Sequence, residues 1–208
     1  MITGDLVASR QAASRDELLS ELKSALNMVD RNFSARHEIY RGDSFQVFVP
    51  NPGEAMRAAI LLRAHLRAVS DSSKPRWDAR VSVGVGEAGR HRESLGESSG
   101  EAFELSGLGL DALSETGGRL VITTPSDLVN EQLALPTRFA DDIISNWSHY
   151  SAEIAYFSLL LDESQSELGK LLGKKQPTIH ARLVTARMKL IEAYIERVRK
   201  VVEQEFAG

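Results

Sequence analysis

Two carboxylates stand where they could bind a divalent metal. Asp5 follows a short apolar stretch, and Asp43 lies in a Gly42-Asp43 turn between two strand-like segments. In a ferredoxin-like sheet these positions are neighbours on adjacent strands, so the pair would hold a metal such as Mg²⁺ that bridges a nucleotide triphosphate. Asp43 also has a purely structural interpretation, because Gly-Asp is common in hairpin turns.

Several groups near these carboxylates could reach phosphates. They are Ser9, Arg10, Arg41 and the backbone of Gly42. Together with Asp5 and Asp43 as metal ligands, they form the predicted nucleotide site. Only four residues precede Asp5, where a central strand usually takes about five, so we expect a short first strand or a trimmed start.

A second group of side chains predicts nucleic-acid chemistry. The whole chain has a net charge of -4, but from residue 151 onward it carries 9 Lys and Arg against 8 Asp and Glu. Between Ser164 and Leu190, Glu167 is the one acid. The same segment holds six basic residues: Lys170, Lys174, Lys175, Arg182, Arg187 and Lys189. A charge run of this kind is also typical of a solvated helix face, so it needs a second signal beside it.

The elements that would position the carboxylates alternate in the first 135 or so residues. Hydrophobic periodicity predicts helices at 14–32, 54–69 and 100–116. Strands are expected before Asp5, at 37–41 and 45–49 around the Gly42-Asp43 turn, at 80–86 and at 119–123. This order predicts an α+β fold, a mostly antiparallel, ferredoxin-like sheet with helices packed on it. The segment from 87 to 101 is expected to be a loop, and Asp141 and Asp142 to be solvated.

The basic cluster coincides with a pattern typical of two short crossing helices. Gly169 supplies the small residue at their close approach, and Gly173 supplies a tight turn. Leu168, Leu172, Ile179 and Leu183 would form the core between them. The alternative is a helical hairpin that only packs on the sheet, which would leave the basic cluster unexplained.

This segment, with Trp147 and a helix from Tyr150 to Leu161 before it, resembles the helix-turn-helix of sigma-factor region 4 and related bacterial regulators. The resemblance implies that the second helix enters the DNA major groove. It assigns base contacts to Gln176, Thr178, His180, Ala181 and Arg182, and phosphate contacts to Lys174, Lys175, Arg187 and Lys189.

The N-terminal part resembles the palm of nucleotide cyclases and GGDEF proteins. The whole chain resembles the SatD-like family, whose members start in a similar way to Thr3-Gly4-Asp5-Leu6-Val7-Ala8-Ser9-Arg10. The segments 80–86, 100–106 and 117–122 follow the class III cyclase order. Where such cyclases carry a purine-binding Lys this chain has Ile39, and Glu104 and Leu108 replace the Asn and Arg that steady the ribose and the reacting phosphate. The resemblance therefore implies nucleotide binding without catalytic residues, since loss of a charge-stabilising cation costs orders of magnitude in rate.

Composition excludes other classes of site. The chain has no Cys, so disulfides, iron-sulfur clusters and thiol nucleophiles are excluded. The five His residues lack metal-ligand spacing, and no Walker loop or nucleophile elbow is found. No apolar run approaches the roughly 18 residues of a membrane span, and the start is unlike a signal peptide, so we expect a cytoplasmic protein.

We therefore expect a cyclase-like domain at 1–135, a linker at 136–146 and a helix-turn-helix domain at 147–208. The long apolar stripe after Leu190 predicts docking on the palm or, preferably, a homodimer. The expected function is a transcriptional regulator that binds double-stranded DNA and senses a nucleotide or second messenger. The alternative is a magnesium-dependent nucleotidyl cyclase or nucleotidyltransferase with a regulatory tail, and a third interpretation is an interaction module with neither ligand.

Overall fold

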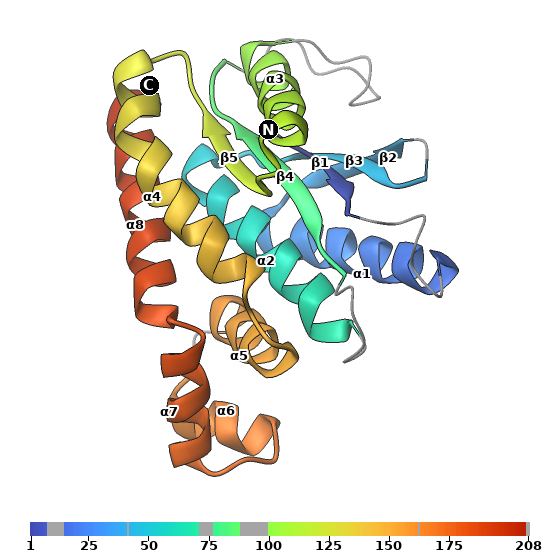
Figure 1. The fold of residues 1–208 in the computed structure, drawn as a ribbon, viewed down its shortest axis with the longest axis vertical. Helices are drawn as coiled ribbons and strands as arrows, with labels where there is room; N and C mark the ends of the chain where they lie inside the picture. The colour runs from blue at the N-terminus through green and yellow to red at the C-terminus, as the bar shows by residue number, and fades with distance from the viewer. Residues whose placement is uncertain (8–14, 41, 71–76, 88–99, 162, 207–208) are drawn as a thin grey trace.

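A computed structural model describes the chain except for residues 8–14, 41, 71–76, 88–99, 162 and 207–208 (Figure 1). Its elements are β1 (Ile2–Leu6), α1 (Arg15–Phe33), β2 (Arg36–Tyr40), β3 (Ser44–Phe48), the 3-10 helix η2 (Pro52–Glu54), α2 (Ala55–Val69), β4 (Ala79–Gly84), α3 (Glu101–Thr116), β5 (Leu120–Thr123), α4 (Asp127–Ser145), α5 (His149–Leu160), α6 (Gln165–Leu171), α7 (Gln176–Thr185) and α8 (Met188–Phe206). The predicted α+β class and the predicted order of elements up to Thr123 are confirmed.

The five strands form one sheet in the order β2-β3-β1-β4-β5. β1 is antiparallel to both β3 and β4, β2 is antiparallel to β3, and β4 and β5 are parallel. In this register Asp5 lies opposite Ser44 on one side and Arg80 on the other. The sheet is therefore mixed, and its register brings the end of β1 beside the turn that holds Asp43.

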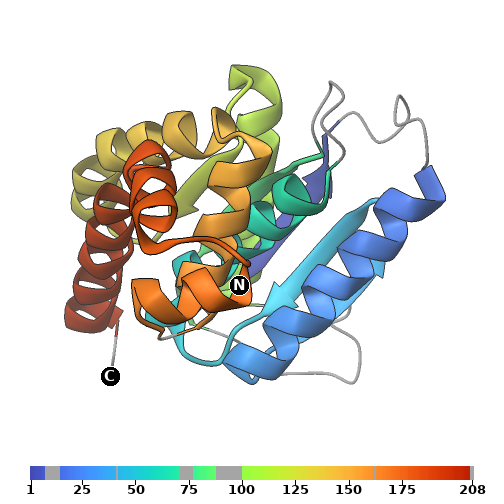
Figure 2. The same ribbon diagram turned by 90° about the horizontal axis from the view of Figure 1, so that it is seen from below.

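Helices cover both faces of the sheet (Figure 2). Side chains alternate along β1, and Ile2 and Leu6 point into the main core with α1 and α2. On the other face Thr3 shares a hydrogen bond of 2.7 Å with Ser106 of α3. Asp5 has the same parity as Thr3, so its carboxylate lies on the α3 side.

The residues expected to form a linker, 136–146, lie almost entirely within helix α4. The hydroxyl of Ser126 caps this helix by accepting a hydrogen bond from the backbone N–H of Val129, and the helix continues to Ser145. Pro136 lies inside it and removes one backbone hydrogen bond without ending the helix. Buried residues at helical spacing, Val129, Leu133, Thr137, Ala140 and Ile144, hold it against the rest of the chain. The prediction of a linker was wrong because tertiary packing outweighs the cost of the proline.

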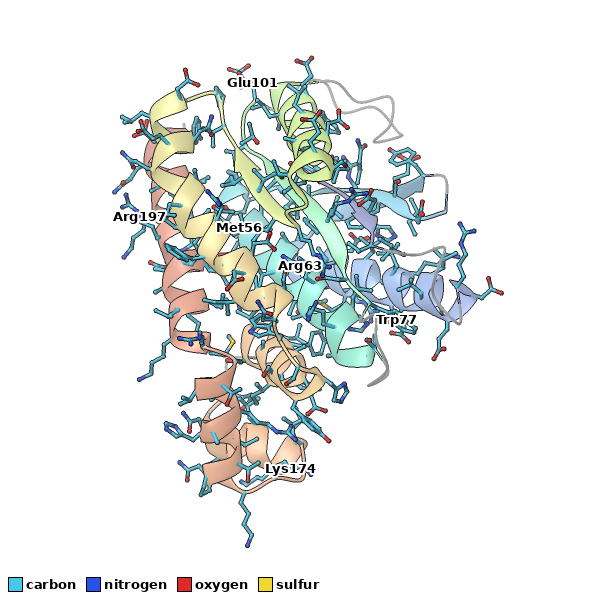
Figure 3. All side chains as sticks on the ribbon, in the orientation of Figure 1. Met56, Arg63, Trp77, Glu101, Lys174 and Arg197 are labelled. Atoms are coloured by element: carbon cyan, nitrogen blue, oxygen red, sulfur yellow. The ribbon has the colours of Figure 1, made fainter. Side chains whose placement is uncertain are left out.

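A buried ionic cluster fastens α4 to the sheet. Asp78 is fully buried, and its carboxylate accepts hydrogen bonds from the guanidinium groups of Arg63, Arg67 and Arg119 at 2.8 to 3.0 Å. Arg63 also donates to Asp141 of α4 at 2.7 Å. The expectation of a solvated Asp141 was therefore wrong. Figure 3 shows Arg63 in the middle of the molecule, between α2 and α4.

These charges tune one another. Burial by itself would raise the pKa of Asp78, but the three guanidinium groups outweigh it and lower that pKa to about 2. Burial, only partly offset by Asp78, lowers the pKa of Arg67. Arg67 also donates to the backbone carbonyls of Ser145 and Trp147, each at 2.8 Å. The cluster thus fixes the chain where α4 ends and α5 approaches.

Helix α8 returns along the outside of the molecule and packs against α4, α2 and η2. The stripe that the sequence shows after Leu190 is buried in the same main core as the sheet residues; it comprises Ile191, Tyr194, Ile195, Val198, Val201 and Val202. The Tyr194 hydroxyl shares a hydrogen bond of 2.8 Å with Thr137 of α4. Two expectations were given for this stripe, docking on the same chain and dimerisation. The packing matches docking on the same chain. Within the described residues, no helix has the length and apolar character of a membrane span.

Candidate nucleic-acid interface

Helix α6 begins at a complete capping box. The Ser164 hydroxyl accepts from the backbone N–H of Glu167, and the Glu167 carboxylate accepts from the backbone N–H of Ser164 at 3.0 Å. The hydrogen bonds from Ser164 lower the pKa of Glu167. The one acid in the basic segment therefore serves to start a helix of only seven residues.

The turn between α6 and α7 depends on two glycines. A Cβ atom on Gly169 would lie 2.7 Å from the backbone oxygen of Lys174, which is closer than such atoms approach. The Gly169 carbonyl also accepts a hydrogen bond of 2.8 Å from the backbone N–H of Lys174. Gly173 has a φ of +60°, a left-handed conformation that favours glycine. The close approach and the tight turn predicted from these residues are both present.

A small core holds the two helices together. Leu168 and Ile179 are buried, while Leu172 and Leu183 are partly buried and pack against the same core. Because α5 also packs against α7, the unit has three helices and stands on the lower end of the molecule (Figure 1).

The outer side of α7 and the turn before it face solvent. We define the α7 surface as the exposed residues Lys174, Lys175, Gln176, Thr178, His180 and Ala181. Lys174 points away from the rest of the molecule at its far tip (Figure 3). Arg187 and Lys189, farther along the chain, are also exposed. No acid occurs between Leu168 and Leu190, so the residues of the α7 surface include no acid; Glu163 and Glu192 lie near His180 across a shared pocket.

Arg182 differs from the other predicted base-contacting residues. Its guanidinium donates to the Glu153 carboxylate of α5 at 2.5 Å and lies 4.4 Å from the centre of the Tyr150 ring. Its side chain is 14% exposed. The resemblance assigns Arg182 a base contact, but an ion pair and a cation-π contact turn its side chain toward α5. Glu153 and Tyr150, which the sequence pattern did not single out, are therefore structural partners of α7.

The end of α7 is fixed from another direction. The indole N–H of buried Trp147 donates to the backbone carbonyl of Ala186 at 2.9 Å. Arg187 follows with a φ of 54°, an uncommon value for a residue other than glycine, and α8 starts at Met188. The orientation of α7 is thus set by Trp147 at one end and by Arg182 on its inner side.

The predicted metal pair, Asp5 and Asp43, lies close together as expected, but an arginine contacts one of its carboxylates. The Asp5 carboxylate accepts two hydrogen bonds from Arg80 of β4, at 2.8 and 2.6 Å, and Arg80 also reaches Ser114 of α3. Hydrogen bonding to Asp5 raises the pKa of Arg80. The carbonyl of Asp43 accepts from the backbone N–H of Leu6 at 3.0 Å, so the two aspartates are close in the fold. Asp5 thus already has a cation as its partner.

The remaining palm candidates are only partly described. Ser9, Arg10 and Arg41 lie outside the described residues, as does most of the expected loop at 87–101. Gly42 is exposed with a φ of +84°. Ile39 packs against the main core, and Glu104 and Leu108 are exposed on α3. Within the described residues, no group of three or more His, Asp or Glu side chains is arranged to hold a metal ion.

Comparison of the chain with protein-family models, with curated proteins and with solved structures gave no match.

Proposed function

We propose that the chain binds double-stranded DNA through α6 and α7, as a helix-turn-helix. The observation that carries this proposal is the α7 surface: an exposed helix face at the protruding end of the molecule, preceded by two lysines and free of acids. A helix that only packed on the sheet would not need this exposed side with two lysines at its start.

The side chains divide into two roles. Gln176, Thr178 and His180 have the hydrogen-bonding groups to read base edges, and Ala181 leaves room for close approach or contacts a thymine methyl. Lys174 and Lys175, with Arg187 and Lys189 farther along, would contact phosphates and so supply affinity without sequence preference. Arg182 orients α7 from behind, through Glu153 and Tyr150.

The sheet and its helices would form the regulatory part. The strand order β2-β3-β1-β4, with α1 and α2 as connections, supports a ferredoxin-like palm to which β5 is added. The buried cluster around Asp78 joins β4 and β5 to the end of α4, and Trp147 joins that point to α7. A nucleotide or second messenger near Gly42 would alter DNA affinity if it favoured one arrangement of these contacts.

The test is binding of the full chain to a pool of labelled random duplexes, followed by fluorescence anisotropy at low and physiological salt. We expect binding that weakens as salt rises. Lys174→Ala with Lys175→Ala should weaken it further, whereas Lys23→Ala, an exposed lysine on α1, should not. Absence of binding at low salt, or equal loss in the α1 control, would refute the proposal.

A melting-temperature screen with nucleotides, with and without Mg²⁺, tests the sensing part separately.

A further inference from the structure

Helix α4 presents a second apolar face to solvent, opposite the face that it buries. Leu128, Leu135 and Phe139 are spaced seven and four residues apart, and they are 64%, 57% and 62% exposed. They are three of the nine large hydrophobic side chains exposed among the described residues. Scattered exposed leucines need no explanation, but three aligned along one helix face indicate an interaction surface.

The charges beside this stripe are arranged for a second copy of the same helix. Glu131 lies four residues before Leu135, and Arg138 lies three residues after it. Both side chains are exposed, and neither forms an ion pair in the part of the chain that is described. If two α4 helices pack antiparallel about a two-fold axis at Leu135, Glu131 of each copy falls beside Arg138 of the other. A two-fold axis repeats this pair twice.

A cavity lies where the same pairing needs one. Between α4 and α8 is a hollow of about 450 Å³, whose walls include Phe139, Asp142, Ile143 and Leu190. In the antiparallel arrangement Leu128 of the second copy lies opposite Asp142, one of the residues that line this hollow. Most walls of the hollow are apolar, with Asp142 and Arg187 as the charged exceptions, and a leucine that enters such a pocket is a usual form of interface anchor.

We propose that the outer face of α4 is an isologous dimer interface, centred on Leu135, in which Leu128 of each copy enters the hollow between α4 and α8 of the other. This interface is separate from the buried α8 stripe. It would place two α7 surfaces in one particle, but it does not depend on DNA binding.

Sedimentation velocity without DNA, over a series of protein concentrations, tests this interface. We expect a dimer with a dissociation constant in the micromolar range, and monomers for Leu135→Asp. Glu131→Arg and Arg138→Glu should each raise the dissociation constant about tenfold, because each turns two attractive pairs into repulsive ones. The double reversal should restore dimerisation. Circular dichroism of each variant confirms that it is folded.

Three outcomes would overturn the proposal: a monomer throughout the concentration series, a dimer that Leu135→Asp leaves intact, or a double reversal no better than the single ones. The second would mean that the chain dimerises elsewhere. Because no DNA is present, failure here is distinguishable from failure of the proposed function.

Discussion

The indole N–H of Trp147 donates a hydrogen bond to the backbone carbonyl of Ala186, 2.9 Å away and 39 residues later in the chain. The bond joins the short segment between α4 and α5 to the residue that follows α7. It is buried, so water cannot replace it. This one contact connects the sheet-bound part of the molecule with the proposed DNA-binding helix.

Trp147→Phe keeps an aromatic side chain of smaller volume and removes the N–H donor. We expect the free energy of unfolding to fall by about 1 to 3 kcal/mol, since the Ala186 carbonyl is left unsatisfied. DNA affinity should fall with it, because α7 is less firmly oriented. Trp77→Phe is the matched control, as the Trp77 indole has no hydrogen bond in the described residues. Equal urea midpoints for the two variants would contradict this role.

Asp78→Asn removes the central anion of the buried cluster. Because three guanidinium groups would lose their shared partner, we expect the free energy of unfolding to fall by about 3 to 5 kcal/mol. Asn is close to Asp in size, so the change is one of charge rather than volume. Urea unfolding at neutral pH measures it. A loss below about 1 kcal/mol, the usual worth of an exposed pair, would show that the cluster contributes little.

Asp78 should also make the stability of the fold depend on pH. The pKa of Asp78 falls from 3.8 to about 2 on folding, so its carboxylate stabilises the folded state above pH 3.8. That stabilisation, about 2 kcal/mol, is lost as the pH falls through 2. When urea unfolding is measured from pH 5 downward, the difference in free energy of unfolding between wild type and Asp78→Asn should therefore become smaller at acid pH. A constant gap would contradict the lowered pKa.

Arg182 and Gln176 should behave differently although they lie on the same helix. Arg182→Ala should lower the melting temperature, and so should Glu153→Gln, with a combined effect smaller than the sum. Gln176→Ala should leave the melting temperature unchanged and relax sequence preference by about 1 to 3 kcal/mol at one base pair. Melting curves and binding to single-base variants of a selected site separate the two. A change of base preference in Arg182→Ala with no loss of stability would restore Arg182 as a base contact.

Gly169→Ala tests the close approach of α6 to the following turn. The added methyl group would meet the Lys174 carbonyl, so we expect a cost of about 1 to 3 kcal/mol. Gly107→Ala in α3 is the control: its Cβ would meet nothing within 4 Å, and alanine should stabilise the helix by about 0.5 to 1 kcal/mol. In thermal unfolding, Gly169→Ala should lower the melting temperature relative to wild type and Gly107→Ala should raise it.

Local sequence patterns predicted many of the elements of the fold. Alternation marked β3, helical spacing marked α1, α2 and α3, and Gly169 with Gly173 marked the α6–α7 turn, because each signal lies within a few residues of its effect. Helix α4 was missed because Pro136 is a strong local signal against a helix, while the packing that overrides it comes from β5 and from helices α8 and α2.

The partners of charged side chains were not predictable in the same way. Asp5 and Arg80 are 75 residues apart, and Arg182 and Glu153 are 29 apart. Their pairing follows from the strand register and from how α7 crosses α5, neither of which a single sequence encodes locally. The sequence could therefore nominate Asp5 and Arg182 for chemistry, but it could not reveal that each already has a partner.

The salt dependence of DNA binding tests the central claim most directly. The logarithm of the binding constant of wild type and of the Lys174→Ala, Lys175→Ala double variant should be plotted against the logarithm of salt concentration. Each lost phosphate contact lowers the slope by about 0.9, so the double variant should lose nearly 2. An unchanged slope would mean that these lysines do not meet DNA, and that α7 is not the helix that binds it.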